Sequence, residues 1–514
     1  MTDNQNLYVA LRAAFPADLD ATAIETCDSA VPRYYTWRDI ERASARIANL
    51  LASLELPAGA RVAVQTEKSV EALLLYLAVL RAGYLYLPLN TAYQAGEIEY
   101  FIGNAEPSVV VCSGRNFPWL SPLAFKAGVQ NVFTLNDDGS GSLLERAAQH
   151  SNEHAPAFRQ ADELAALLYT SGTTGRSKGA MLTHGNLLAN ARTLHAWWGW
   201  QASDVLIHAL PIFHVHGLFV ASHGALLAGA KMLWFSRFDP KACIAQMRRA
   251  TVFMGVPTLY VRMLAEASLT RQACAWMRVF VAGSAPLLPE TFEAWRERSG
   301  HTIVERYGMS ETVILTSNAY HPQDGERRAG TVGHVLPGMQ LRVRDDKGHA
   351  CGVGEVGGIE VKGPSVFKGY WRMPEKTAEE FTDDLWFKTG DVGKIDAQGV
   401  VTFVGRSKDL IISGGYNVYP AEIEACLNEQ PGVAESAVVG VPHADFGEAV
   451  VAVVVPAPGV RVDGAALIAA LKGRIANFKV PKQVFVQAEL PRNQMGKVQK
   501  NLLREQHKGL FLDT

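Results

Sequence analysis

The sequence has few cysteines and no pair of them in a Cys-x-x-Cys spacing. Six scattered cysteines argue against a disulfide framework or a metal cluster and favour a reducing cytoplasm. Most are expected to pack as small apolar residues. They are Cys27, Cys112, Cys243, Cys274, Cys351 and Cys426.

Long apolar runs and charge bias are absent as well. No stretch approaches the roughly 18 uninterrupted apolar residues of a membrane span. The N-terminus, Met1-Thr-Asp-Asn-Gln-Asn, has neither a basic region nor an apolar core, so we do not expect a secretory signal. With 49 Lys plus Arg against 51 Asp plus Glu, no global field favours nucleic acid or an anionic membrane. We therefore expect a cytoplasmic protein whose partners are small-molecule substrates.

At 514 residues the chain is too long for one hydrophobic core, and a prior of about 150 residues per domain suggests about three to four compact units. Strand and helix patterns alternate through most of its length. Strands are predicted at 61–65, 109–112 and 205–210, and an amphipathic helix at 69–82 begins at a Ser69 cap. This alternation predicts an α/β fold with mostly parallel, helix-covered sheets.

The pattern changes in the last third of the chain. Short alternating strands such as 340–344, separated by glycine-rich turns, predict a small β-barrel-like lobe over about residues 330–400. A compact α+β pattern then runs to the C-terminus. We place a hinge at Lys408, which divides the chain into a large N-terminal domain, residues 1–407, and a small α+β domain, residues 408–514.

The segment from Tyr169 to Gly179 reads Tyr-Thr-Ser-Gly-Thr-Thr-Gly-Arg-Ser-Lys-Gly and follows the apolar run 164–168. Glycines let main-chain N–H groups approach phosphate oxygens, hydroxyls donate further hydrogen bonds, and Lys178 supplies a positive charge. The spacing is not the Gly-x4-Gly-Lys-Ser/Thr of a P-loop. A plain turn between strands is the alternative. The order of the eleven residues favours a polyphosphate-binding loop.

Seven further motifs follow this loop. They are Leu210-Pro-Ile-Phe-His-Val-His-Gly, Gly283-Ser-Ala-Pro, Glu305-Arg-Tyr-Gly-Met-Ser-Glu-Thr, Thr389-Gly-Asp, Gly405-Arg-Ser-Lys-Asp, Gly414-Gly-Tyr-Asn-Val-Tyr-Pro and Pro491-Arg-Asn-Gln-Met-Gly-Lys. Over essentially its full length, the chain resembles the adenylate-forming superfamily of acyl-CoA synthetases, luciferases and peptide-synthetase adenylation domains.

This resemblance implies a reaction in two steps. A carboxylate attacks the α-phosphate of ATP to give acyl-AMP and pyrophosphate, and the thiol of CoA then displaces AMP. Because the first step brings two anions together, positioned cations and a metal are expected to offset the repulsion. ATP and Mg²⁺ are the implied cofactors, and CoA is the implied co-substrate.

The resemblance also assigns residues to the nucleotide. Gly283 and its neighbours are expected to lie flat against adenine, Tyr307 to stack on it, and Asp391 with Arg406 to hold the ribose hydroxyls. Simple turns are the alternative for both segments. The full ATP/AMP set is Thr170, Ser171, Gly172, Thr173, Thr174, Lys178, Gly283, Ser284, Ala285, Tyr307, Gly308, Ser310, Asp391 and Arg406.

Two charged residues match the chemical centre of the family. Lys497 matches the lysine that bridges carboxylate and α-phosphate, and a solvated lysine is the alternative. Glu311 matches the carboxylate that holds Mg²⁺, and a helix-starting Glu beside Ser310 is the alternative. Most relatives have Thr where Ser310 stands, so the hydroxyl is kept. Acetylation of Lys497 would remove its charge, so an acetyltransferase is an implied partner.

The hinge at Lys408 is expected to serve the second step. Two half-reactions need two sets of groups around one carbon, and rotation of the small domain supplies them. By analogy, the 413–417 hairpin enters the site for the second step, with Gly414, Gly415 and Tyr416 lining the CoA channel.

The acid is expected to be a dicarboxylate. Its far end needs a buried cation, because an unpaired buried carboxylate costs several kcal/mol. Arg262, on a helix after Pro257, is one candidate cation, and Ser284 supplies a further donor. A surface pair between Arg262 and Glu266 is the alternative.

Five segments resemble the malonate–CoA ligase branch. They are Pro88-Leu-Asn-Thr-Ala-Tyr, Gly172-Thr-Thr-Gly-Arg-Ser-Lys-Gly, His214-Val-His-Gly-Leu-Phe-Val, Gly369-Tyr-Trp-Arg-Met-Pro-Glu-Lys-Thr and Val441-Pro-His-Ala-Asp-Phe-Gly-Glu. In that branch Arg262 and Ser284 match the residues that hold the distal carboxylate. Arg306 stands beside the acyl-phosphate region as a further group for the substrate carboxylate, and His214 matches a residue lining that region. His214, Arg306 and Lys497 are thus the catalytic candidates.

One departure leaves the acid open. Residues 313–315 read Val-Ile-Leu where the branch is expected to carry Asn-Met-Asn-like residues, so 2-substituted malonates such as methylmalonate also fit. A monocarboxylate–CoA ligase, a non-enzymatic nucleotide-binding module and a carrier-loading adenylation domain are the remaining alternatives.

Overall fold

The computed structural model describes residues 3–29, 31–170, 177–413, 416–443, 446–472, 474–493 and 496–511. The chain forms two compact units. One comprises Met1–Gln340 with Lys362–Phe387, and the other comprises Leu341–Val361 with Lys388–Thr514. The second unit thus includes two segments that precede Lys408. The hinge itself concerns a movement and stays a prediction.

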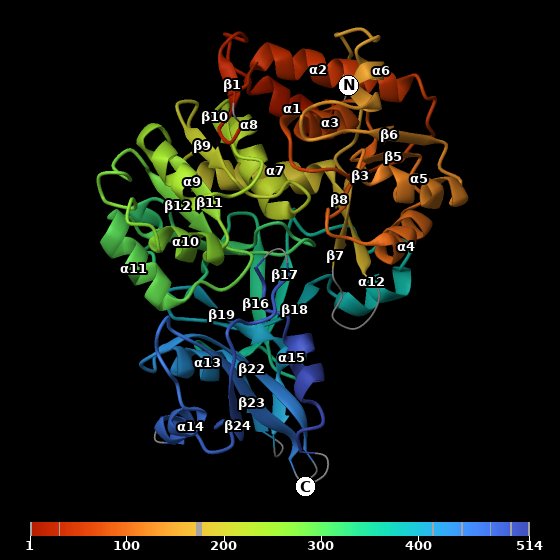
Figure 1. Cartoon of the computed structure of the whole chain (residues 1–514). Coiled ribbons are helices and arrows are strands. Elements are labelled where there is room, and N and C mark those ends of the chain that lie inside the picture. Colours follow the sequence, from red (N-terminus) through yellow and green to blue (C-terminus); the bar gives the residue numbers. More distant parts are fainter. Residues whose placement is uncertain are drawn as a thin grey trace. The chain divides into compact units, whose positions relative to one another are not determined.

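One sheet of the first unit has the strand order β15-β14-β13-β12-β11-β9-β10-β1-β2 (Figure 1). Neighbours from β13 to β1 are parallel, and β15, β14 and β2 are antiparallel to their partners. The strands are β1 (Thr22–Thr26), β2 (Tyr34–Thr36), β9 (Val205–His208), β10 (Lys231–Trp234), β11 (Val252–Gly255), β12 (Val279–Ala282), β13 (Ile303–Tyr307), β14 (Thr316–Ser317) and β15 (Gly333–Val335).

A six-stranded sheet in the same unit has the order β6-β5-β3-β4-β7-β8, parallel except for the pair β7 and β8. The strands are β3 (Arg61–Gln65), β4 (Leu85–Pro88), β5 (Val109–Cys112), β6 (Asn131–Thr134), β7 (Leu164–Thr170) and β8 (Lys178–Thr183). The α/β class and the mostly parallel sheets predicted from the sequence are confirmed.

Helices join and cover these strands (Figure 1). They are α1 (Leu7–Ala13), α2 (Trp37–Ala52), α3 (Val70–Arg81), α4 (Ala95–Ala105), α5 (Phe117–Lys126), α6 (Ser142–Ala147), α7 (His184–Trp197), the π-helix η1 (His216–Ser222), α8 (His223–Ala228), α9 (Pro240–Gln246), the 3₁₀ turn η2 (Met247–Arg249), α10 (Pro257–Leu264), α11 (Pro289–Ser299), the 3₁₀ turn η3 (Pro322–Asp324) and α12 (Pro374–Glu380).

Helix α3 forms part of the core of the first unit. The Ser69 hydroxyl caps it by accepting a hydrogen bond from the N–H of Ala72, as predicted from the sequence. Every residue of α3 is buried, so the prediction of an amphipathic helix is wrong: the helix is apolar on most of its circumference and is enclosed on all sides. Its one buried arginine, Arg81, donates to the Tyr8 hydroxyl at 2.9 Å and to the Glu41 carbonyl at 2.8 Å.

The second unit contains two groups of strands. In one, the order β16-β17-β18-β19 joins the short strands that the sequence predicted for the small lobe. In the other, the order is β21-β20-β23-β22, with β24 beside β23. The elements are β16 (Gln340–Arg344), β17 (Gly357–Lys362), β18 (Phe387–Ile395), β19 (Val400–Arg406), η4 (Ser407–Asp409), β20 (Ile411–Ser413), β21 (Tyr416–Val418), α13 (Pro420–Asn428), β22 (Val433–His443), β23 (Gly447–Pro456), α14 (Gly464–Lys472), β24 (Gln483–Val486) and α15 (Lys500–His507).

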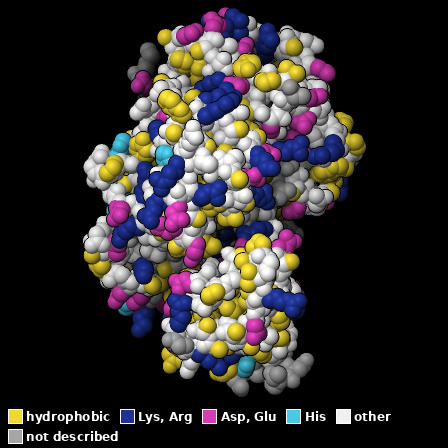
Figure 2. Space-filling model, turned by 60° about the vertical axis from the view of Figure 1, so that its left-hand side comes forward, with side chains coloured by type: hydrophobic (Ala, Val, Ile, Leu, Met, Phe, Trp, Pro, Cys, Tyr) yellow, Lys and Arg dark blue, Asp and Glu magenta, His cyan; other side chains and the backbone are white. Residues whose placement is uncertain are grey.

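Basic and acidic side chains are interspersed on the face that Figure 2 shows. Within the described ranges, no helix combines the length and the apolar character that crossing a membrane requires. All six cysteines are free thiols.

Candidate active site

The carboxyl ends of the adjacent parallel strands β12 and β13 bring several predicted residues together. Ala282 and Glu305 are Cα partners, so Gly283-Ser284 and Arg306-Tyr307 continue side by side. In open α/β sheets, ligands bind at such carboxyl ends. The segment containing Gly308 turns away against the Val313 carbonyl, to which a Cβ on Gly308 would lie within 1.9 Å.

Arg306 is the central cation of this group. Its side chain is on β13, and the residue is only 4% exposed. Its Nη2 donates to the Ser284 hydroxyl at 3.4 Å, and its buried Nε has no hydrogen-bond partner in the described part of the chain. Burial lowers the pKa of Arg306 to about 9, so the guanidinium remains charged at neutral pH.

Gly283 and Ser284 lie directly against the Arg306 side chain. A Cβ on Gly283 would lie 2.6 Å from the guanidinium carbon, so a side chain at this position would have to displace the Arg306 guanidinium. Ser284 adopts a left-handed backbone with φ of 71°, a strained conformation of the kind found at functional sites. Across the described residues, Arg306 pairs with no carboxylate. Because a buried unpaired charge is costly, this geometry fits an anion supplied by a ligand.

His216, the first residue of the π-helix η1, completes the group. Its Nδ1 lies 3.4 Å from the Ser284 hydroxyl, and its Nε2 is buried with no partner among the residues described. Burial, followed by the charge of Arg306, holds the pKa of His216 well below its usual value, so the ring is neutral at neutral pH. His214, which the sequence selected instead, is half-buried and accepts from the His216 N–H at 3.4 Å.

The predicted phosphate loop lies in the sequence between the paired strands β7 and β8. Thr170 and Lys178 are Cα partners at its two ends, and the Thr170 hydroxyl donates to the Lys178 carbonyl at 3.4 Å. Ser171, Gly172, Thr173 and Thr174 lie outside the described residues. The Lys178 ammonium pairs with Glu380 at 3.3 Å and lies 4.2 Å from the centre of the Tyr370 ring.

Tyr370 connects this lysine to the predicted metal ligand. Its hydroxyl donates to Glu311 Oε1 at 3.0 Å, while its ring contacts the Lys178 ammonium. Glu311 is only 5% exposed and lies in a turn, which excludes the alternative of an exposed helix-starting glutamate. Sequence reasoning missed Tyr370, although the Gly-Tyr-Trp segment that contains it was noted.

Other predicted residues of the first unit have clear positions. Tyr307 ends β13 and is buried, whereas Ala285, Gly308 and Ser310 are half-buried. Arg262 is exposed in the last turn of α10. The alternative Arg262–Glu266 pair does not form within the described residues, because Glu266 faces Lys241 at 3.9 Å.

In the second unit, the predicted ribose pair is brought together. Asp391 on β18 and Arg406 on β19 are Cα partners, and Arg406 Nε lies 2.7 Å from Asp391 Oδ1. Asp391 is fully buried. Lys408 follows in η4, and burial lowers its pKa.

The remaining predicted residues lie on hairpins of the second unit. Ser413 and Tyr416 are Cα partners at the ends of the β20–β21 hairpin, and Tyr416 stacks on Phe478 at 4.6 Å. Gly414 and Gly415 are outside the described residues. Lys497 closes a turn in which its N–H donates to the Asn493 side chain at 3.0 Å.

The comparisons with known proteins decide the family. A family model described as AMP-binding enzyme matches residues 12–371, and one for the C-terminal domain of these enzymes matches residues 422–497. The chain belongs to the AMP-binding enzymes.

Similarities to individual proteins support the same family assignment. The structure of ATP-bound MatB from Rhodopseudomonas palustris is 52% identical, with a TM-score of 0.95 over 99% of this chain and 100% of that chain. The malonate–CoA ligase of Arabidopsis thaliana is 34% identical over 87% of this chain and 78% of that protein. The indoleacetate–CoA ligase of Aromatoleum aromaticum is 35% identical over 90% and 91%. Curated relatives therefore include enzymes for different acids.

Glu305 is a further buried group that the sequence did not select. One carboxyl oxygen accepts from the Leu287 N–H at 2.9 Å, and the other is buried without a partner in the described ranges. Burial raises the pKa of Glu305 to about 8. The carboxyl is therefore mostly protonated at neutral pH in the folded AMP-binding enzyme.

We predict that Glu305→Gln stabilises the enzyme increasingly from pH 5 to pH 8. In the unfolded chain this carboxyl ionises near its ordinary pKa of 4.5. Between that value and about 8, only the folded state keeps the proton, so the contribution of Glu305 to stability falls as pH rises. Glutamine does not titrate and can still accept from Leu287. Melting temperatures of both proteins at four pH values measure the effect.

Glu297→Gln, at an exposed position of α11, is the control for losing a charge as such. A constant difference in melting temperature between wild type and Glu305→Gln across this pH range would contradict the prediction.

Proposed function

We propose that this AMP-binding enzyme is a malonate–CoA ligase. Malonate attacks the α-phosphate of ATP, the bond to the β-phosphate oxygen breaks, and pyrophosphate leaves. The CoA sulfur then attacks the acyl carbon of malonyl-AMP, AMP leaves, and the thiol proton passes to solvent. The cytoplasm is the proposed location, supported by six free cysteines.

The single observation that carries the choice of acid is the buried Arg306 guanidinium. A monocarboxylate pocket needs only apolar walls. Here the Ser284 hydroxyl lies 3.4 Å from Arg306 Nη2 and 3.4 Å from His216 Nδ1. The charged guanidinium can hold the distal carboxylate of malonate, with Ser284 and the neutral ring of His216 as further partners. The Arabidopsis relative is a malonate–CoA ligase, which supports the same choice.

A monocarboxylate such as an arylacetate is the second candidate acid. The indoleacetate–CoA ligase is as similar to this chain as the malonate enzyme is. Residues Val313, Ile314 and Leu315 are fully buried and apolar, which also favours room for a substituent on malonate. Methylmalonate and other 2-substituted malonates are therefore included in the proposal.

The Lys178–Tyr370–Glu311 group is proposed to receive the polyphosphate. The Lys178 ammonium can hold phosphate oxygens, and Tyr370 orients both its neighbours through ring and hydroxyl. Mg²⁺ fits this group, because it binds proteins through one or two carboxylates together with substrate phosphates. Glu311 would hold the ion, which when bound neutralises charge on the phosphates.

Lys497 is proposed to bridge the attacking carboxylate and the α-phosphate in the first step. Its turn is held by two hydrogen bonds with Asn493, one from each N–H, at 3.0 and 2.9 Å. Acetylation would remove the charge that this role requires, so an acetyltransferase is part of the proposal.

We predict that protein acetylated at Lys497 loses pyrophosphate exchange, because the acetylated side chain carries no charge. Mass spectrometry checks that acetylation is complete. Full pyrophosphate exchange by the completely acetylated protein would refute the prediction.

We predict that Arg306→Met lowers kcat/KM for malonate by about 100-fold or more, because breaking a buried charge pair costs about 3–5 kcal/mol. Activity with butyrate should be retained, since butyrate has no distal carboxylate. A panel of acids in pyrophosphate exchange, with AMP release as the second readout, measures both. Equal losses with malonate and butyrate would contradict the dicarboxylate assignment.

Arg262→Leu belongs in the same panel, with Arg42→Leu as its matched control, since both arginines are exposed and helical. The loss of malonate activity for Arg262→Leu should be smaller than for Arg306→Met, because solvent screens an exposed charge. An effect no larger than that of Arg42→Leu would remove Arg262 from the carboxylate site.

We predict that Lys408→Pro spares malonyl-AMP formation and abolishes thioester formation. Proline in η4, between β19 and β20, restricts the backbone rotation that the second half-reaction is proposed to need. Pyrophosphate exchange measures the first step and malonyl-CoA release the second. Loss of both steps together would argue against a hinge at Lys408.

A further inference from the structure

A chain of buried hydrogen bonds runs from Lys68 to the π-helix that carries His216. Lys68 lies between β3 and α3 and is only 9% exposed. Its ammonium lies 3.0 Å from His208 Nδ1 and 2.8 Å from the His208 carbonyl oxygen, and 4.4 Å from the centre of the Trp234 ring. The connection between β3 and α3 is thereby tied to the end of β9.

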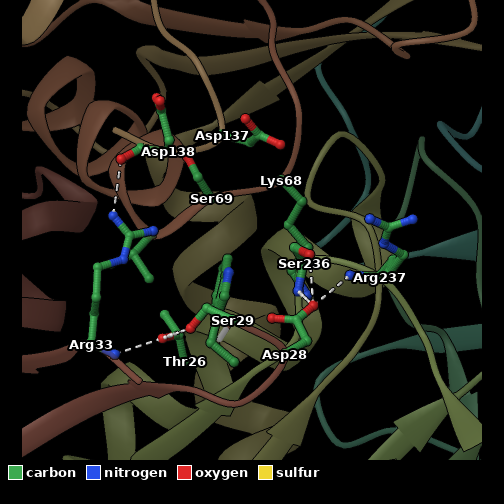
Figure 3. Close-up of a pocket in the computed structure, with 12 residues that line it drawn as sticks. Thr26, Asp28, Ser29, Arg33, Lys68, Ser69, Asp137, Asp138, Ser236 and Arg237 are labelled. Atoms are coloured by element: carbon green, nitrogen blue, oxygen red, sulfur yellow. Dashed lines mark hydrogen bonds between the residues drawn. The ribbon is translucent and has the colours of Figure 1, made fainter. Parts of the chain in front are cut away.

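Lys68 has no carboxylate partner among the described residues, which is unusual for a lysine at this depth. It lines a cavity of about 440 Å³ that also contains Asp28 (Figure 3). The Asp28 carboxylate accepts instead from the N–H and hydroxyl of Ser236, both at 2.6 Å, and from the N–H of Arg237 at 3.3 Å. The hydrogen bonds of Lys68 therefore point inward to His208.

His208 also forms hydrogen bonds with the π-helix η1. Its Nε2 lies 3.0 Å from the Gly217 carbonyl oxygen and 3.0 Å from the Ser222 hydroxyl, which itself donates to the Gly217 carbonyl at 2.9 Å. The Gly217 carbonyl oxygen only accepts, so His208 Nε2 carries the proton. Burial holds the pKa of His208 well below its usual value, so the ring is neutral and its Nδ1 accepts from Lys68. In this tautomer His208 donates to η1.

The anchored carbonyl belongs to the residue next to His216. A Cβ on Gly217 would lie 2.1 Å from the Pro211 carbonyl oxygen, so the backbone here is also fixed against the preceding loop. π-Helical turns are rare and frequently lie at functional sites. A shift of this turn would move His216 away from Ser284 and Arg306.

We infer that Lys68 and His208 are positioning residues for acid selection, holding the first turn of η1 so that His216 stays beside Ser284 and Arg306. This inference rests on the proposed dicarboxylate specificity. Neither residue touches the acid. Their effect reaches it through the Gly217 carbonyl and the place of His216.

The test compares two substitutions of His208. Asparagine keeps an acceptor near Nδ1 for Lys68 but does not reach the Gly217 carbonyl, whereas glutamine places an N–H near Nε2 and keeps that bond. His208→Asn should raise KM for malonate about tenfold, as expected of a group displaced by a fraction of an ångström, and leave KM for ATP and activity with butyrate within about twofold. His208→Gln should restore most of the malonate affinity. Lys68→Met should behave like His208→Asn.

His223→Asn is the matched control. His223 is a buried histidine directly after η1, but its Nε2 bonds to the Tyr76 hydroxyl of α3 at 2.7 Å. It should lower the melting temperature without changing the preference for malonate over butyrate. Ser222→Ala is the substitute if the His208 variants do not fold. It deletes one hydrogen bond to the Gly217 carbonyl and leaves no buried charge unpaired. Like His208→Asn, it should raise KM for malonate.

Three outcomes would overturn the inference: equal losses with malonate and butyrate, equal effects of His208→Asn and His208→Gln, or a loss of preference in His223→Asn as large as in His208→Asn. A raised KM for malonate that persists undiminished when His208→Asn is combined with His216→Ala would also overturn it, because the effect would not pass through His216. Arg306→Met separates the two proposals: if it leaves acid preference unchanged, the dicarboxylate assignment fails, whatever the His208 variants do.

Discussion

A buried guanidinium with no protein carboxylate beside it, as far as the structure describes the chain, is the constraint that orders the proposed acyl site. A side chain at position 283 would displace the Arg306 guanidinium, because its Cβ would lie 2.6 Å from the guanidinium carbon. It also favours a neutral His216, since a second buried charge of the same sign would be repelled. The strained backbone of Ser284 persists because both neighbours contact its hydroxyl. A bound carboxylate would satisfy all three residues at once.

Tyr370 plays the corresponding part at the proposed phosphate site. It belongs to a segment far along the chain from Lys178 and Glu311, yet one aromatic side chain contacts both. The Lys178 ammonium pairs with Glu380, while the Glu311 carboxylate accepts from the Tyr370 hydroxyl. Two opposite charges beside one tyrosine can each bind a different part of a magnesium–polyphosphate group.

Much of the fold could be predicted from local patterns. The Ser69-capped helix and the strands at 61–65 and 109–112 were predicted because capping, length and apolar runs act over a few residues. The motifs also placed Asp391 with Arg406, which the structure pairs across two strands. His216, Tyr370 and Glu305 were not selected, although each lies in or beside a motif, because a residue type in a motif does not reveal its burial or its partners.

The sequence by itself determined the family, the α/β class and the order of the charged and glycine-rich segments. Each of these depends on patterns that span only a few neighbouring residues. The tertiary structure decided which of those residues meet. It buried Arg306 and left Arg262 at the surface, although both are arginines singled out by the same resemblance. Burial and partner geometry arise from packing between segments up to hundreds of residues apart, and the pKa of each group follows from that packing rather than from its neighbours in sequence.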